Sequence, residues 1–167
     1  TILHPLSKPS KGVRLDATAH VIASEHQAVS PREHAAYALC AQITRTRARN
    51  FYYGLRLLPE PKRSAMYSIY AWMRAADDAV DDAGSNQERQ ARLAAFRQQT
   101  DRVLTDAHAD DFASGNTDDP QSPPTLWLAF RTTVQRFPLE RRIFLDTLDG
   151  MEDDLRTFEY QTEEELS

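Results

Sequence analysis

The sequence is poor in cysteine and glycine and contains no long hydrophobic run. Its one cysteine, Cys40, has no partner for an internal disulfide, which fits a reducing compartment such as the cytosol. Five glycines among 167 residues argue against a glycine-rich phosphate loop and against a loop-rich β fold. No segment reaches the roughly 18–20 consecutive apolar residues of a membrane-spanning helix, and no secretory signal is recognisable at the start. We therefore expect a cytoplasmic protein, with peripheral membrane contact left open.

Charge is unevenly distributed along the chain, whose formal net charge is −5. Residues 1–76 carry 11 Lys or Arg against 4 Asp or Glu, whereas residues 77–167 carry 9 against 21. Such asymmetry is typical of nucleic-acid-binding proteins with an acidic tail. It is equally typical of a protein in which one site holds an anion together with the cation that accompanies it. Charge alone does not distinguish these two classes of protein, so the choice depends on the sequence motifs.

The residue pattern predicts an all-α fold with no boundary between domains. We expect residues 1–29 to form a loosely ordered arm and residues 30–167 to form one helical domain. Ser30 with Glu33, and Ser85 with Glu88, have the spacing of capping boxes that open helices. Residues 110–124 contain three prolines and are expected to be a surface loop. Helices are expected at about residues 31–46, 62–82, 86–104, 125–137 and 139–158.

The helix expected at residues 62–82 carries a polar column beside an apolar stripe. At about 100° per residue, the column lies roughly 90° from the stripe, with Asp78 at its edge. The stripe consists of Met66, Ile69, Met73, Ala76 and Val80, and the column of Tyr70, Arg74, Asp77 and Asp81. Two carboxylates four residues apart repel each other, and negative charge is disfavoured near a helix C-terminus. A divalent cation removes both penalties, because Mg²⁺ commonly takes one or two carboxylates together with substrate phosphate oxygens.

Spacing alone also allows simpler interpretations of these residues. The four aspartates of residues 77–82 could be a solvated helix end, and Arg74 could be an ion partner of Asp77 and Asp78. Tyr70 could belong to the rim of the core. The basic and aromatic segment at residues 45–56 could bind nucleic acid, but the negative net charge and the lack of a recognised motif argue against it. We therefore expect no nucleic-acid partner.

Three segments follow one another between Asn50 and Asp81: Asn50-Phe51-Tyr52-Tyr53, Arg56-Leu57-Leu58-Pro59, and Ile69-Tyr70-Ala71 followed by Arg74, Asp77-Asp78 and Asp81. This residue order resembles the squalene/phytoene synthase family, which comprises head-to-head prenyl diphosphate synthases of the all-α isoprenoid synthase fold. A weaker resemblance to the family's Asp-Gly-Met-x-x-Asp-Leu stretch occurs at residues 148–155.

This resemblance implies a catalytic role for four residues of the column. Asp77 and Asp81 match the first Asp-rich motif of the family, which binds Mg²⁺ bridged to diphosphate, with two or three ions in the complete site. Arg74 and Tyr70 match residues that line the diphosphate site and are expected to act in both catalysis and substrate binding.

The preceding segment is expected to bind substrate as well. Phe51 matches an aromatic residue near the developing carbocation, which the face of a ring can stabilise without attacking it. Asn50 stands where the family often has Ser, and either side chain can donate a hydrogen bond to a phosphate oxygen. Arg47 and Arg49 could add positive charge, although basic residues in such positions are usually only solvated.

The implied activity is a Mg²⁺-dependent 1′-1 condensation of two prenyl diphosphates, farnesyl or geranylgeranyl, towards squalene, presqualene diphosphate or phytoene. No nucleotide-binding motif is visible, and a requirement for NADPH stays open. The family's second Asp-rich motif has no counterpart before Ser167, and Glu163, Glu164 and Glu165 are expected to open a further helix instead. We therefore expect the N-terminal part of a synthase, incomplete at its C-terminus and inactive without the missing half or a partner chain. The alternative is a non-catalytic scaffold or assembly protein on the same fold, which would have no need of Asp77 and Asp81.

Overall fold

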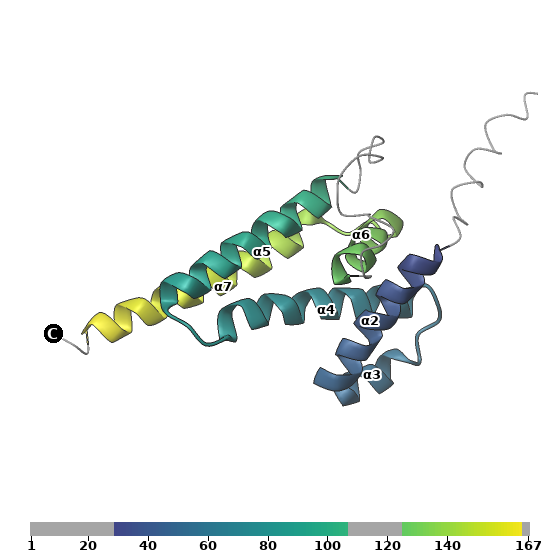
Figure 1. The fold of residues 1–167 in the computed structure, drawn as a ribbon, viewed down its shortest axis with the longest axis horizontal. Helices are drawn as coiled ribbons and strands as arrows, with labels where there is room; N and C mark the ends of the chain where they lie inside the picture. Colours follow the sequence, from purple (N-terminus) through teal and green to yellow (C-terminus); the bar gives the residue numbers. More distant parts are fainter. Residues whose placement is uncertain (1–28, 107–124, 165–167) are drawn as a thin grey trace, which may run out of the picture.

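The computed structural model describes residues 29–106 and 125–164, and every regular element in these ranges is an α-helix. Figure 1 shows α5 and α7 side by side as a long pair, with α4 running from them to α2, α3 and α6. The all-α prediction is confirmed. The expectations for residues 1–28 and for the loop at 110–124 lie outside the described residues. The helices are α2 (Pro31–Arg47), α3 (Arg49–Leu55), α4 (Lys62–Asp81), α5 (Asn86–Asp106), α6 (Leu126–Arg136) and α7 (Arg141–Glu164).

Both predicted capping boxes are present. At the start of α2, Glu33 N donates to Ser30 Oγ at 3.2 Å, and Ser30 N donates to Glu33 Oε2 at 2.6 Å. At the start of α5, Glu88 N donates to Ser85 Oγ at 3.2 Å, and Ser85 N donates to Glu88 Oε2 at 2.7 Å. These pairs satisfy backbone donors that have no partner within the helix, so the beginnings of α2 and α5 are determined locally.

An aromatic core joins α4 to the helices packed against it. Trp72 of α4 is 2% exposed, stacks on Phe130 of α6 and meets Phe144 of α7 edge-on, with ring centroids 5.7 and 5.1 Å apart. Its indole N–H donates to the buried Thr100 Oγ1 of α5 at 3.0 Å. One side chain therefore connects four helices and also satisfies its own polar atom.

A second cluster holds α2 against α4 and α6. It contains Tyr37 and Cys40 of α2, Tyr67 of α4 and Ala129 of α6, and the half-buried Val29 packs against it. The hydroxyl of Tyr37 hydrogen-bonds to Thr133 Oγ1 of α6 at 3.1 Å. Burial raises the pKa of the Cys40 thiol to about 12, so this cysteine is a small core residue and not a nucleophile.

The apolar stripe identified on α4 is not the face that the helix buries. Ala76 is the only member of that stripe that is fully buried, and Met73 is 42% exposed. The buried face is instead built on Ala65, Ser68 and Trp72, where small residues allow close helix packing around the indole. The large apolar side chains of the stripe are therefore left partly accessible beside the polar column.

Two boundaries differ from the sequence-based expectation. The short helix α3 lies in the basic and aromatic segment, to which no helix had been assigned, and it ends before Pro59. Helix α7 begins at Arg141 and continues to Glu164, so Glu163 and Glu164 extend this helix and do not open another. Ile143 is apolar and precedes the buried Phe144, yet it is 60% exposed. Phe144, Leu148 and Leu155 share one face at spacings of four and seven residues, and Ile143 lies about 100° away from it.

Among the helices in the described ranges, none combines the length and the apolar character needed to cross a bilayer.

Candidate active site

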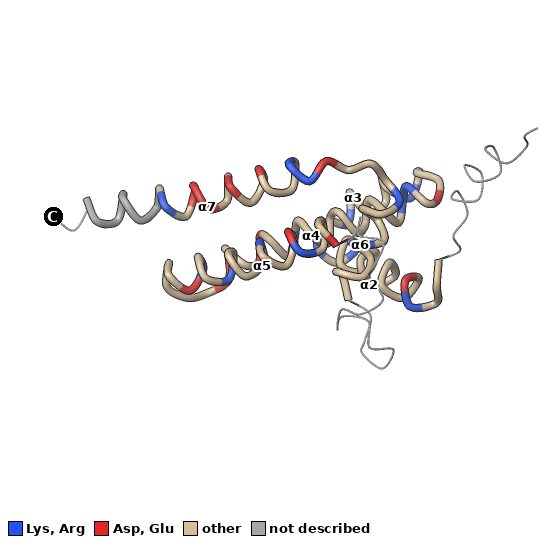
Figure 2. The backbone as a smooth tube through the Cα atoms, turned by 90° about the horizontal axis from the view of Figure 1, so that it is seen from above, with Lys and Arg blue, Asp and Glu red and all other residues tan. Residues whose placement is uncertain are grey.

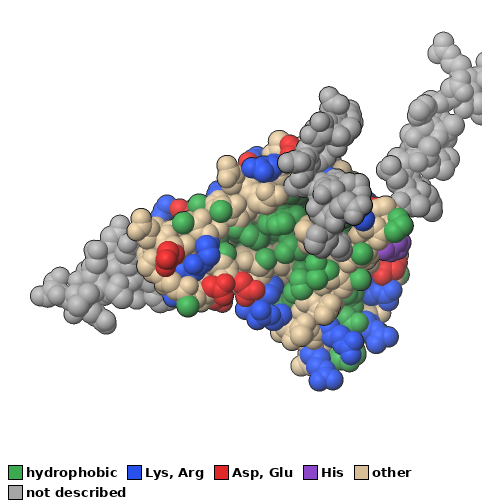
Figure 3. All heavy atoms as spheres, in the orientation of Figure 1, with side chains coloured by type: hydrophobic (Ala, Val, Ile, Leu, Met, Phe, Trp, Pro, Cys, Tyr) green, Lys and Arg blue, Asp and Glu red, His purple; other side chains and the backbone are tan. Residues whose placement is uncertain are grey.

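The polar column of α4 lies along the side of the helix that the core does not cover. Tyr70, Arg74 and Asp77 are half-buried, and Asp81 is exposed at the last residue of the helix. Met66, Ile69 and Val80, also half-buried, flank this column together with the exposed Met73. Figure 3 shows hydrophobic side chains gathered across the middle of the molecule, with acidic side chains at the C-terminal end of α4. The arrangement combines charged groups with apolar surface on one face.

Arg74 is held by carboxylates of its own helix. Its Nη2 donates to Asp78 Oδ1 at 2.6 Å, and its Nη1 lies 3.9 Å from Asp77 Oδ2. Partial burial opposes the charge of the guanidinium, but Asp78, Asp77 and Asp81 outweigh it and raise the pKa of Arg74 above its ordinary value. These are the intrahelical ion pairs that the spacing allowed. They keep a permanent cation beside Asp77 and Asp81, so they are compatible with a role in binding an anion.

Asp77 is in an environment that opposes its ionisation. Partial burial raises the pKa of Asp77, Arg74 acts in the opposite direction, and repulsion from Asp81 and Asp78 adds to the increase. A bound cation would relieve this repulsion, and two carboxylates one turn apart suit Mg²⁺ when phosphate oxygens and water complete its coordination. No cluster of three or more potential ligands from His, Cys, Asp and Glu occurs within the described part of the chain. The described residues therefore form no all-protein cage, and the two carboxylates would hold a metal only together with other ligands.

An aromatic pair connects α3 to the column. The rings of Phe51 and Tyr70 are tilted at 42°, with centroids 5.4 Å apart, and Phe51 is 43% exposed. Next to them, Tyr52 stacks on Tyr67 at 5.3 Å, and the Tyr67 hydroxyl donates to the backbone carbonyl of Tyr52 at 3.4 Å. The stacked pair fixes α3 on α4, and Phe51 consequently presents an accessible ring next to the charged column.

Basic side chains of α2 and α3 lie next to the acidic residues of α4. Arg47, at the end of α2, has its Nη2 3.8 Å from Asp78 Oδ2, so the structure brings this arginine to the edge of the column. Arg49 and Asn50 are exposed on the first turn of α3. Within the described residues the Asn50 side chain makes no hydrogen bond to the column. Basic side chains gather over α2 and α3 in Figure 3, so positive charge lies next to the column and would attract an anion.

Sequence reasoning missed Arg92 of α5. Its guanidinium donates to two backbone carbonyls at the end of α4, those of Ala79 and Asp82. One feature of the sequence could have indicated such a residue: this acidic helix end has no basic residue in its last turn. A cation from another element is then needed, but the sequence alone does not say which of the later arginines supplies it.

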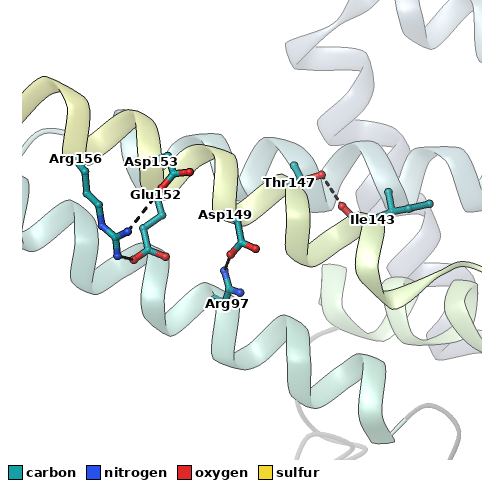
Figure 4. A network of polar contacts seen from close by, with 7 residues as sticks. All are labelled: Arg97, Ile143, Thr147, Asp149, Glu152, Asp153 and Arg156. Carbon is teal, nitrogen blue, oxygen red and sulfur yellow. Dashed lines mark hydrogen bonds and ion pairs between the residues drawn. The ribbon is translucent and has the colours of Figure 1, made fainter.

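The weaker motif at residues 148–155 lies on α7 and is engaged in ion pairs. Asp149 forms an ion pair with Arg97 of α5 (Figure 4). Arg156 Nη2 lies 2.5 Å from Glu152 Oε1, and Arg156 Nη1 lies 3.7 Å from Asp153 Oδ1. Acidic positions recur along α7 in Figure 2. Of these pairs, Arg97–Asp149 joins α7 to α5, whereas the two pairs of Arg156 lie within α7. Exposed pairs of this kind each contribute little to stability.

The chain was also compared with known proteins. Residues 44–167 match the family model described as squalene/phytoene synthase. The chain is 34% identical over 131 residues to 15-cis-phytoene synthase of Synechococcus elongatus, covering 78% of this chain and 38% of that protein. It is 36% identical over 115 residues to phytoene synthase of Mycobacterium tuberculosis, covering 69% and 33%. It is 30% identical over 131 residues to phytoene synthase 1, chloroplastic, of Zea mays, covering 78% and 28%.

No solved structure matches the chain. The chain spans about a third of the length of the curated relatives that it matches. The family model covers well over half of the chain, including α3, the whole of α4 and the Asp-Gly-Met stretch of α7. The chain belongs to the squalene/phytoene synthase family.

Proposed function

We propose that the full protein containing this chain catalyses a Mg²⁺-dependent head-to-head, 1′-1 condensation of two prenyl diphosphates. The observation that carries this proposal is the column of α4, in which Arg74, Asp77 and Asp81 lie beside accessible apolar side chains. A prenyl diphosphate has the same two parts, a multiply charged head and an apolar tail. The names of the relatives favour phytoene as the product. Squalene and presqualene diphosphate arise from the same first step with farnesyl substrates.

In this proposal Asp77 and Asp81 would hold Mg²⁺, which would supply positive charge to stabilise the leaving diphosphate. Arg74 adds a fixed cation one turn earlier on the same helix, and Arg47 adds a second at the edge of the column. These charges are needed because the allylic C–O bond breaks with its electron pair leaving on the diphosphate oxygen.

The aromatic and apolar residues serve the cation that this bond cleavage leaves behind. The rings of Phe51 and Tyr70 can stabilise a delocalised positive charge without forming a bond to it. Met73 and its apolar neighbours on α4 limit the access of water, which would otherwise capture the cation. The double bond of the second prenyl diphosphate then attacks, a proton is lost, and a cyclopropylcarbinyl diphosphate is formed.

The described residues supply one side of such a site. The second carboxylate group and the residues that enclose the prenyl chains would come from the part of the family's length that this chain does not span, or from a partner chain. We therefore expect no turnover by residues 1–167 alone.

The proposal is tested by removing the two carboxylates from the full protein. Asp77→Asn with Asp81→Asn should abolish Mg²⁺-dependent binding of farnesyl and geranylgeranyl diphosphate, measured by calorimetry, while helicity by circular dichroism is unchanged. The matched control is Asp82→Asn with Asp106→Asn, which removes the same charge from the end of α4 and the end of α5 and should bind as the wild type does. Equal binding by wild type and the first double variant would refute the metal assignment.

A further inference from the structure

The C-terminal end of α4 carries more negative charge than a helix end tolerates unaided. Asp77, Asp78, Asp81 and Asp82 lie in its last turns and at its cap, and no basic residue lies in the last turn. The partial negative charge of unpaired carbonyls at a helix C-terminus adds to this unfavourable electrostatics. A helix end of this kind should fray unless a cation from another element satisfies it.

Arg92 of α5 is that cation. Its Nε donates to the carbonyl of Ala79 at 3.0 Å, and its Nη2 donates to the carbonyl of Asp82 at 2.9 Å. The guanidinium therefore binds the last turn of α4 at two points with one planar group, which a lysine ammonium cannot reproduce. Ala79 and Asp82 flank Asp81, so the two hydrogen bonds bracket the backbone that carries this carboxylate.

The turn between α4 and α5 passes close to the same arginine. Gly84 has φ of +147°, and a Cβ atom at this position would lie 2.8 Å from Glu88 Oε2 and 3.3 Å from Arg92 Nη1. Only glycine combines this backbone conformation with such a close approach. The capping box of Ser85 and Glu88 fixes the start of α5, and Arg92 lies one turn after Glu88 on this helix.

We propose that Arg92 is a positioning residue that holds Asp81 in register with Asp77 and Arg74. The guanidinium contacts backbone carbonyls and acts through the helix end, without touching the substrate. This inference rests on the proposed function, since it assigns Arg92 to the support of the metal–diphosphate site. Removal of a group that orients a metal ligand typically lowers metal affinity by about 10- to 100-fold.

The test compares Arg92→Gln and Arg92→Lys with wild type in the full protein. Arg102→Gln, an exposed arginine on the same helix, is the matched control. Amide hydrogen exchange of peptides covering residues 77–85 reports the order of the helix end in the absence of metal. Calorimetry with inorganic pyrophosphate and MgCl₂ reports the site without depending on the length of a prenyl chain.

For Arg92→Gln we expect exchange at residues 79–84 to be at least about ten-fold faster and pyrophosphate affinity to fall about 10- to 100-fold. Arg92→Lys should recover part of both effects, because it restores the charge and one of the two hydrogen bonds. Arg102→Gln should match wild type in both measurements. Rescue graded in this way is not expected of a residue that only contributes to global stability.

Three outcomes overturn the inference. Exchange in Arg92→Gln at the wild-type rate would mean that the helix end does not depend on this arginine. Faster exchange with wild-type pyrophosphate affinity would limit Arg92 to a structural cap. Absence of Mg²⁺-dependent pyrophosphate binding by the wild type would remove the proposed function itself, and this result is recognised before any variant is compared.

Discussion

Arg47 and Asp78 approach to 3.8 Å between the last residue of α2 and the end of α4. Asp78 also accepts the hydrogen bond from Arg74, so one carboxylate is shared by two arginines from different helices. In this arrangement Asp78 offsets the repulsion between the two cations, and Arg74 also lies 3.9 Å from Asp77 Oδ2 through its Nη1. Two arginines from different helices are thereby held at the edge of the column.

Replacing Arg74 with Ala should weaken the binding of pyrophosphate with Mg²⁺ by about 10- to 100-fold, because a charge-assisted contact to the anion is lost. The midpoint of thermal unfolding should change by no more than about 2 °C, since partly exposed intrahelical ion pairs contribute little to stability. Calorimetry and a thermal melt of the same preparations measure both. Arg142→Ala is the control, because Arg142 also has an intrahelical ion pair, with Asp146, but lies on α7. A large loss of thermal stability with unchanged binding would show that Arg74 is only structural.

The burial pattern of α7 predicts opposite outcomes for two neighbouring apolar residues. Leu148 is completely buried, and Leu148→Ala should lower the free energy of unfolding by about 2–5 kcal/mol through lost burial and a cavity. Ile143 is 60% exposed, and Ile143→Ala should remain within about 0.5 kcal/mol of wild type. Urea unfolding followed by circular dichroism separates the two. Comparable losses for both variants would mean that Ile143 is covered in the full protein.

Glu33 predicts a specific pH dependence of stability. Burial opposes its charge, but hydrogen bonds from Ser30 and from Thr132 of α6 outweigh this effect and hold the pKa of Glu33 below its ordinary value. Because the pKa of Glu33 is lowered in the folded state, its ionised carboxylate stabilises the fold at pH values above the ordinary pKa of glutamate. This contribution is lost as the pH falls through the lowered value.

Glu33→Gln should therefore be less stable than wild type at neutral pH, and the difference should shrink towards zero as the solution is acidified. Urea unfolding at a series of pH values measures this difference directly. The exposed Glu140→Gln serves as the control and should show no such trend. A difference between wild type and Glu33→Gln that is independent of pH would contradict the assignment of this charge to the helix start.

Local sequence signals predicted much of this molecule correctly. Capping boxes, prolines and the 3.6-residue period identified α2, α4, α5 and α6 to within about two residues, because these features act within one helix. The column on α4 was found for the same reason. The buried face of α4 was not identified, because this helix has apolar residues on two sides. Which of the two sides faces the core depends on the neighbouring helices. Arg92 was missed because its partners are carbonyl groups at the end of another helix, and the sequence does not say which of the later arginines reaches them.

Phe51 provides a test that separates catalysis from binding. Its ring is accessible and lies against Tyr70, and the proposal assigns it to the cation that is left when the diphosphate departs. Under the proposed function, Phe51→Leu keeps the apolar surface but loses the π face, so kcat should fall while KM changes little. A cation–π contribution of about 2 kcal/mol corresponds to a reduction of about 30-fold in kcat.

The matched control is Tyr53→Leu, because Tyr53 is 45% exposed on the same short helix. Steady-state kinetics of the full protein, with the prenyl diphosphate that it condenses, should show wild-type kcat for Tyr53→Leu. If Phe51→Leu raised KM and left kcat unchanged, the ring would contribute to substrate binding alone. Phe51→Tyr retains an aromatic face and should recover most of the wild-type kcat, which separates the loss of the π system from a change in packing between α3 and α4.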